Sequence, residues 1–176
     1  MATWLIDPAH SEVQFKVRHL VISTVTGSFK KFECTVQSEK DDFSDASVQF
    51  SAETASIDTN NEQRDAHLKS DDFFNAEKYP KITFVSTRIE KRTGDEYVLI
   101  GNLTIRDVTK PITLKVEYGG QTVDGYGQTK AGFEVTGKLK RQEYHLKWNA
   151  LTEGGGVVVS DEVRLILNVQ LIKQAS

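Results

Sequence analysis

The stretch Ser11–His19 has the sequence S-E-V-Q-F-K-V-R-H, in which Val13, Phe15 and Val17 alternate with polar and charged residues. Side chains of a β-strand point to opposite faces with a period of two, so the stretch predicts a strand with one dry and one wet face. The same alternation returns in Val163–Leu171. The sequence therefore predicts a sheet whose dry face is filled either by side chains or by a guest molecule.

Turn residues divide the chain into about eight such strands and one short helix. Residues 60–70 lack the branched and aromatic residues that strands favour, and Thr59-x-x-Glu62 matches a capping box, so a helix is expected there. Many strands separated by turns predict an all-β sandwich or closed barrel. The expected strands are Ser11–His19, Gly27–Val36, Ala46–Thr54, Ile82–Ile89, Glu96–Asp107, Ile112–Tyr118, Gly125–Lys140 and Val163–Leu171, with a connection at 108–111.

Composition limits the possible functions. The 176 residues suit one domain over 1–176, and a net charge of −3 without a block of like charge argues against a nucleic-acid partner. No run approaches the roughly 18 apolar residues of a membrane span. Met1 leads directly into the first apolar residues, which predicts a cytoplasmic protein as the sequence is written, or a periplasmic or secreted one if a leader was removed.

Few residues offer chemistry beyond packing. Cys34 is the single cysteine, so an internal disulfide and a multi-cysteine metal site are excluded, and we expect a small, half-buried strand residue. The sequence contains no H-x-H or H-E-x-x-H motif, and we predict no metal and no cofactor. Among the four histidines, His19 shares the parity of Val13 and is expected to face inward.

Five motifs make the chain similar to one known family. They are W-x-I-D-x-x-H-S-x-V-x-F-x-V-x-H at 4–19, R-D-x-H-L-x-S-x-D-F-F at 64–74, P-x-I-x-F-x-S at 80–86, G-x-L-T-I-x-x-V-T-K-P at 101–111 and D-x-V-x-L-x-L at 161–167. In this order they resemble the YceI-like family, also called polyisoprenoid-binding proteins. The resemblance implies an elongated antiparallel barrel of about eight strands, lipocalin-like in shape. It also implies a bound prenyl quinone, polyprenyl phosphate or other long-chain amphiphile.

Two residues depart from the family pattern. Asp107 stands where the family often has a glycine before V-T-K, and His145 stands in R-Q-E-Y-H-L-x-W where a glycine is usual. The change at Asp107 bears on the rim of the pocket, and the change at His145 bears on the local backbone and on contacts with a head group. The resemblance also makes a homodimer an expectation, with strand edges or exposed apolar residues such as Ile22 and Val25 as contacts.

A barrel of eight strands can hold one small ligand or be filled by side chains. The Leu68–Phe74 segment is expected to serve as a lid or merely to cap one barrel end, and His67 and Arg141 are candidates for contact with a head group. The candidate cavity-lining residues are Val13, Phe15, Val17, His19, Phe50, Leu68, Phe73, Phe74, Phe84, Leu103, Ile105, Phe133, Val135, Trp148, Val163, Leu165 and Leu167.

Three functions remain open at this point. The first is a carrier, store or sensor of an isoprenoid-tailed amphiphile, whose affinity would come from about 0.8 kcal/mol per buried CH₂. The second is an enzyme acting on such a lipid, based on His67 near Asp65. The third is a solidly packed structural module. Because no nucleophile–base or metal arrangement stands out, we predict a binding protein without catalytic activity.

Overall fold

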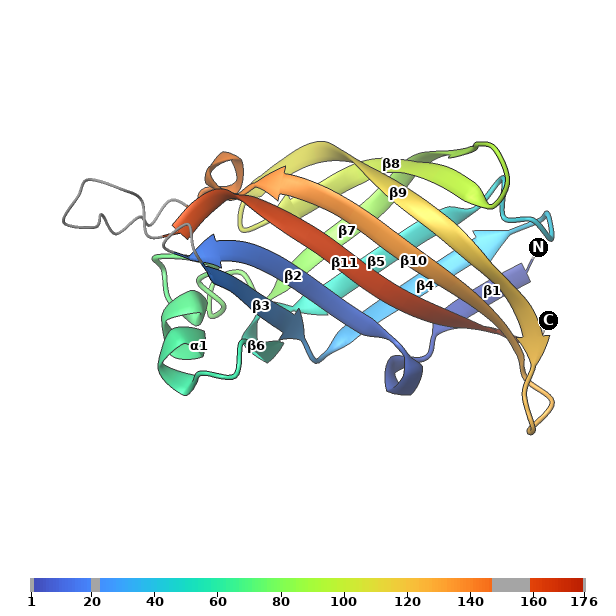
Figure 1. The fold of residues 1–176 in the computed structure, drawn as a ribbon, viewed down its shortest axis with the longest axis horizontal. Coiled ribbons are helices and arrows are strands. Elements are labelled where there is room, and N and C mark those ends of the chain that lie inside the picture. The colour runs from blue at the N-terminus through green and yellow to red at the C-terminus, as the bar shows by residue number, and fades with distance from the viewer. Residues whose placement is uncertain (1, 20–22, 147–158, 176) are drawn as a thin grey trace.

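The computed structural model describes residues 2–19, 23–146 and 159–175, with the side chains of His19 and Val159 excepted. It is an elongated, closed antiparallel barrel with one α-helix at one end (Figure 1). The strands are β1 Ala2–Ile6, β2 Glu12–His19, β3 Ser23–Phe29, β4 Phe32–Ser38, β5 Ser47–Glu53, β6 Ile57–Asp58, β7 Lys81–Lys91, β8 Glu96–Ile105, β9 Val108–Val123, β10 Thr129–Lys140 and β11 Val159–Lys173. The helices are α1 Glu62–Lys69 and the short 3₁₀ turns η1 Pro8–His10, η2 Thr54–Ser56 and η3 Arg141–Tyr144.

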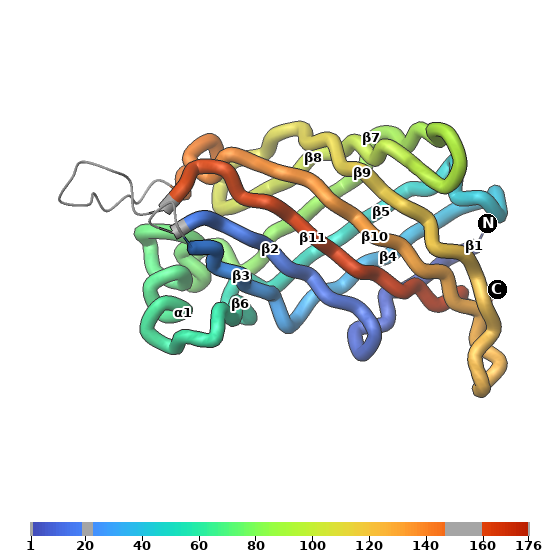
Figure 2. Tube along the Cα trace, viewed as in Figure 1, coloured from blue at the N-terminus to red at the C-terminus, as the bar shows by residue number. Residues whose placement is uncertain are grey.

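Eight strand paths form the described barrel, because three of the paths are interrupted. β1 and β2 both lie along β11, and the ring closes where β1 pairs with β11 on one side and with β4 on the other. In the same way β3 continues into β4, and β5 continues into β6. The strands run obliquely around the bore (Figure 2). The all-β barrel with one short helix is therefore confirmed.

The break between β1 and β2 is a turn built from Asp7 and the residues of η1. The Asp7 carboxylate caps η1 by accepting the backbone N–H of Ala9, and Pro8 occupies the first position of the turn. His10 Nδ1 lies 2.8 Å from Asp7 Oδ2. The turn interrupts the path along β11, so that β1 and β2 pair with β11 as two separate strands.

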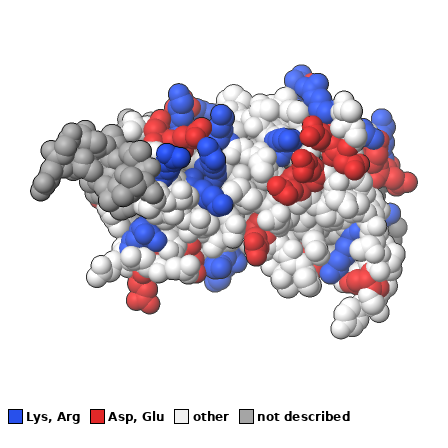
Figure 3. All heavy atoms as spheres, viewed as in Figure 1, with Lys and Arg blue, Asp and Glu red and all other residues white. Residues whose placement is uncertain are grey.

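Alternation places the apolar residues inside. On β2, Val13 is buried while Glu12 and Lys16 are exposed, and on β8 the residues Tyr97, Leu99 and Leu103 are buried. Charged side chains of both signs are interspersed on the outer face that covers β10, β11 and β2 (Figure 3). The predicted division into a wet and a dry face is confirmed.

The connection between β8 and β9 lies two residues earlier than expected. It consists of Arg106 and Asp107, and β9 already includes Pro111, which lies opposite Asn102. A proline lacks the N–H that a central strand needs. β10 pairs with β9 only from Lys115 onward. The absence of an N–H at Pro111 therefore leaves no hydrogen bond to β10 unmade.

Helix α1 is shorter than expected and is capped differently. Asn61 is the N-cap and accepts the N–H of Arg64, so the predicted capping box at Thr59 is wrong. No residue of α1 is fully buried. Because an isolated eight-residue helix is marginal in water, its contacts with neighbouring segments must hold it in place. In the part of the chain that the structure describes, no helix is long and apolar enough to span a bilayer.

One of the two apolar contacts expected for a homodimer is not exposed. Val25 is half-buried and lines the interior, which corrects its assignment as an exposed residue, and Ile22 lies outside the described residues. The large hydrophobic residues that do lie exposed are Leu5, Val85, Val123 and Tyr126. A homodimer stays a prediction.

Candidate functional site

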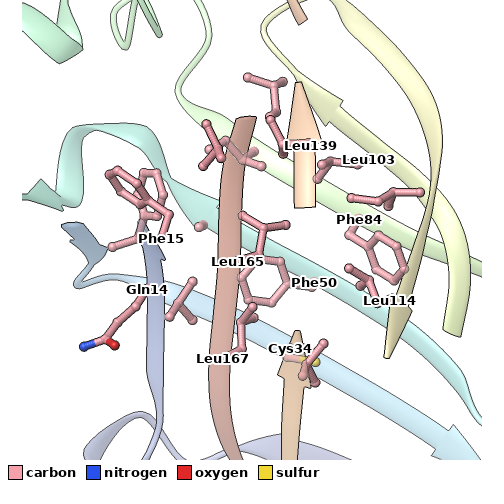
Figure 4. A pocket seen from close by; sticks show the side chains of 18 of the residues that line it. Gln14, Phe15, Cys34, Phe50, Phe84, Leu103, Leu114, Leu139, Leu165 and Leu167 are labelled. Atoms are coloured by element: carbon pink, nitrogen blue, oxygen red, sulfur yellow. The ribbon is translucent and has the colours of Figure 1, made fainter. Parts of the chain in front are cut away.

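A cavity of about 590 Å³ occupies the bore of the barrel. Figure 4 shows its wall, where leucine and phenylalanine side chains from several strands point toward one another while Gln14 points away. A volume of this size lies within the range of sites for small organic ligands. It greatly exceeds the space of a few waters, which counts against the solidly packed alternative.

The structure brings the predicted lining residues together around this cavity. The side chain of His19 and the whole of Trp148 lie outside the described part of the chain. The candidates found on the cavity wall are Val13, Phe15, Val17, Phe50, Leu68, Phe73, Phe74, Phe84, Leu103, Ile105, Phe133, Val135, Val163, Leu165 and Leu167, together with the head-group candidates His67 and Arg141. Their contact with a lipid stays a prediction.

An aromatic cluster closes the end of the bore near the two termini. Phe43, only 2% exposed, lies at its centre with ring centroids 5.1 Å from both Trp4 and Phe133. Tyr118 packs on the same rings at 5.7 Å from Phe43 and 5.2 Å from Phe133. The hydroxyl of Tyr97 donates to the Asp42 carbonyl, which anchors the loop that carries Phe43. This cluster is the floor of the cavity.

Phe73 and Phe74 cover the opposite end, where α1 lies (Figure 1). Phe74 packs edge-on against Phe29 at 5.9 Å. From the β8–β9 connection, Arg106 donates to the carbonyls of Asp71 and Phe73 at 2.7 Å each. The segment that follows α1 is thereby tied across this end of the barrel.

The polar part of the lining is concentrated at the α1 end. Apart from Gln14 on β2, it consists of Thr59, Asn61, Gln63, Arg64 and His67 from the α1 segment and Arg141 from η3. An apolar bore with a closed floor and polar residues at the other end suits an amphiphile inserted tail first. The tertiary structure thus shows which end of the cavity is polar, a point that the sequence left open.

Arg141 is a buried cation at this end. It is 2% exposed, and its Nε donates to the Ser160 carbonyl at 2.8 Å and its Nη1 to the Leu146 carbonyl at 2.5 Å. Burial lowers the pKa of the Arg141 guanidinium, and the charge of Asp161 partly counters that shift. These bonds hold the turn between β10 and the segment that follows it.

The arrangement proposed for an enzyme is not formed. Asp65 Oδ1 accepts the backbone N–H of Thr59 at 2.9 Å and its hydroxyl at 2.5 Å. His67 Nε2 lies 2.8 Å from Asp72 Oδ2, and both side chains are substantially exposed. Among the described residues, no group of three or more His, Cys, Asp or Glu side chains is placed to hold a metal ion.

Several lining residues were missed by the sequence reasoning. Phe29, Leu114 and Leu139 lie on the dry parity of their strands, so alternation alone could have found them. Cys34 also lines the cavity, and its burial raises the pKa of the thiol to about 12. Arg64 also lines the cavity, and no local signal in the sequence marks it as a cavity residue.

Comparison with known proteins agrees with this geometry. A model of the YceI-like domain family matches residues 4–171. The chain belongs to the YceI-like family. Protein YceI of Escherichia coli O157:H7 is 40% identical over 165 residues, which cover 94% of this chain and 83% of that protein. Protein YceI of Salmonella newport has the same identity over the same shares of the two chains.

Solved structures show the same YceI-like barrel. The crystal structure of Campylobacter jejuni YCEI protein has a TM-score of 0.75 at 33% identity, over 90% of each chain. Burkholderia cenocepacia BcnA has a TM-score of 0.82 at 24% identity, over 94% of this chain and 98% of that one. A polyisoprenoid binding domain from Saccharophagus degradans shares the fold, with a TM-score of 0.71 at 13% identity over 97% and 98% of the two chains.

Proposed function

We propose that this protein binds the tail of an isoprenoid-tailed or other long-chain amphiphile, such as a prenyl quinone or a polyprenyl phosphate, inside the barrel. The observation that carries the proposal is the cavity of about 590 Å³, which is apolar along the bore and polar at the α1 end. The Saccharophagus degradans relative is described as a polyisoprenoid binding domain, which supports the same ligand class. In this proposal the protein is a carrier, store or sensor.

Energetics favour the tail as the source of affinity. Burial of each five-carbon unit is worth roughly 3–4 kcal/mol gross, whereas a neutral head-group hydrogen bond nets about 1 kcal/mol. Ordering a flexible tail subtracts part of the gain. The aromatic floor around Phe43 sets the depth to which a tail can enter.

Native mass spectrometry of gently purified protein tests the proposal, because one spectrum gives the ligand mass and the subunit count. We expect a long-chain lipid at close to one per barrel, and organic extraction should release it unchanged. Lipid-free protein that takes up no prenyl quinone from solution, while its near-UV circular dichroism is that of a folded protein, would refute the proposal.

Two neighbouring positions on β11 provide a matched pair of variants. Leu167 lines the cavity and Asn168 is exposed on the outer face. Leu167→Trp narrows the bore and is expected to lower lipid occupancy at least tenfold, whereas Asn168→Trp adds the same side chain outside and should leave occupancy unchanged. Equal occupancy in the two variants would place the ligand outside the bore.

A further inference from the structure

The described cavity wall carries basic side chains and no acidic ones. The guanidinium groups of Arg64 and Arg141 and the imidazole of His67 contribute to it, and the described lining contains no aspartate or glutamate. A guanidinium pairs with a carboxylate or a phosphate through two parallel N–H···O bonds and through the attraction of opposite charges, neither of which an alcohol head offers. A negatively charged head at this end would therefore gain more than a neutral head of similar size.

Arg64 is held in place before any ligand arrives. Its Nε donates to the Thr59 hydroxyl at 2.8 Å and its Nη2 to the Thr59 carbonyl at 2.6 Å. Thr59 is itself buried and is fixed by Asp65. A guanidinium with a preset orientation loses little conformational entropy when it binds an anion.

Among the described residues, no ion pair neutralises the charge of Arg64. No carboxylate of the described residues lies within 4.0 Å of its guanidinium, and Nη1 makes no hydrogen bond among them. Three acidic residues of the same segment are engaged elsewhere: Asp65 with Thr59, Asp72 with His67, and Asp71 with Arg106. Arg64 thus presents a half-buried positive charge beside an apolar bore.

Arg141 approaches the same cavity from another side. It begins η3 at the end of β10, and both η3 and α1 lie at the same end of the barrel (Figure 1). Its bonds to the Ser160 and Leu146 carbonyls fix its position. Two guanidinium groups from separate elements therefore contribute to one end of one cavity.

We propose, building on the lipid-binding function above, that the natural ligand carries an anionic head, a phosphate or a carboxylate on one apolar chain, and that Arg64 selects it. Arg141 adds to the positive potential at this end. The proposal narrows the ligand class from long-chain amphiphiles in general to single-chain anions.

Matched ligand pairs with identical tails test the head directly. Isothermal titration of the whole chain compares farnesyl phosphate with farnesol, and oleate with oleyl alcohol, each below its aggregation concentration. We expect at least tenfold tighter binding of the anion in one pair or both, and the pair with the larger difference distinguishes a phosphate from a carboxylate. This comparison uses the wild-type chain and does not depend on any variant folding.

Variants then assign the preference to a residue. Arg64→Gln should reduce the anion preference, measured as the ratio of the affinities for farnesyl phosphate and farnesol, about tenfold, and Arg64→Lys should restore part of that ratio. Arg88→Gln is the control, because Arg88 is an exposed β7 residue paired with Glu90 and does not line the cavity. Circular dichroism establishes that each variant is folded.

The possible results separate the two proposals. Equal affinity for anion and alcohol in the wild type overturns the anionic head but leaves lipid binding intact. Binding of neither ligand in either pair overturns lipid binding itself, and this inference with it. An anion preference that persists in folded Arg64→Gln overturns the assignment to Arg64.

Discussion

His145 Nδ1 lies 3.2 Å from Asp107 Oδ1, which joins the two positions at which this chain departs from its family's sequence pattern. His145 ends η3 and Asp107 belongs to the connection between β8 and β9. Both side chains are about half exposed, so the pair itself contributes no more than about 1 kcal/mol. The contact bridges two connections at the α1 end of the barrel.

The backbone at His145 leads to the first prediction. Its φ of 62° lies in the left-handed region, where glycine is favoured and a branched residue fits badly. His145→Val should lower the free energy of unfolding by about 1–2 kcal/mol in urea titration, whereas His145→Asn should change it by less than about 0.5 kcal/mol. Equal losses in the two variants would show that the side-chain contact, and not the backbone, makes His145 suitable.

A close backbone approach at Gly101 leads to the second prediction. A Cβ at this position would lie 2.5 Å from the Val85 carbonyl oxygen and 2.6 Å from Phe84 Cζ, where β7 bulges between Ser86 and Arg88. Gly101→Ala should therefore cost about 1–3 kcal/mol of stability in thermal or urea unfolding. Gly125→Ala is the control, since a Cβ there meets nothing within 4 Å; a comparable loss in that control would contradict the explanation.

The third prediction concerns stability in acid. Burial would raise the pKa of Asp7, but hydrogen bonds from His10, Lys130 and the Ala9 N–H outweigh it and lower that pKa below 3.8. A lowered pKa in the folded state means that the stabilisation is complete above the unfolded-state value and is lost as pH falls through the folded one.

Unfolding midpoints measured from pH 7 down to pH 2 test whether the ionised Asp7 carboxylate stabilises the fold. Asp7→Asn should cost about 2 kcal/mol at pH 7 and should make stability less dependent on pH below about pH 5. Asp41→Asn removes the same charge at an exposed site and serves as the control. An unchanged acid slope in Asp7→Asn would refute the role given to this carboxylate.

The fourth prediction concerns Cys34. Burial raises the pKa of its thiol to about 12, so almost none of the reactive thiolate is present at pH 8. Iodoacetamide should modify folded protein at least a hundredfold more slowly than protein unfolded in urea, as followed by mass spectrometry. Rapid modification of the folded form would show that the cavity opens to solvent often.

The fifth prediction concerns tail length. The lining residues of β11 run from Val163 to Leu171, a length of about 26 Å at a rise of about 3.3 Å per residue. Affinity should rise from geranyl to farnesyl to geranylgeranyl ligands with one common head, and should level off once the tail reaches the aromatic floor. Competition titration measures the series, and a flat series would argue against insertion into the bore.

Much of the fold and part of the cavity wall could be predicted from the sequence alone. Alternation in Ser11–His19 and Val163–Leu171 predicts strands with one dry face, because side chains alternate wherever the backbone is extended. The cavity-lining candidates on those strands do lie on the cavity wall. The turn at Asp7 and the close backbone approach at Gly101 are likewise local, since each depends on only a few residues.

Other features needed the tertiary structure. Sequence alone does not distinguish a packed interior from an empty one, because the volume left in the bore depends on how eight strand paths close and tilt together. The contacts of Phe43 with Trp4 and of Asp107 with His145 join residues far apart in the chain. The orientation of the cavity and the position of Arg64 on its wall are likewise long-range results, and local pattern carries no information about them. The sequence by itself determined which face of each strand is dry, and only the closed barrel decided that this dry face surrounds a cavity with one basic end.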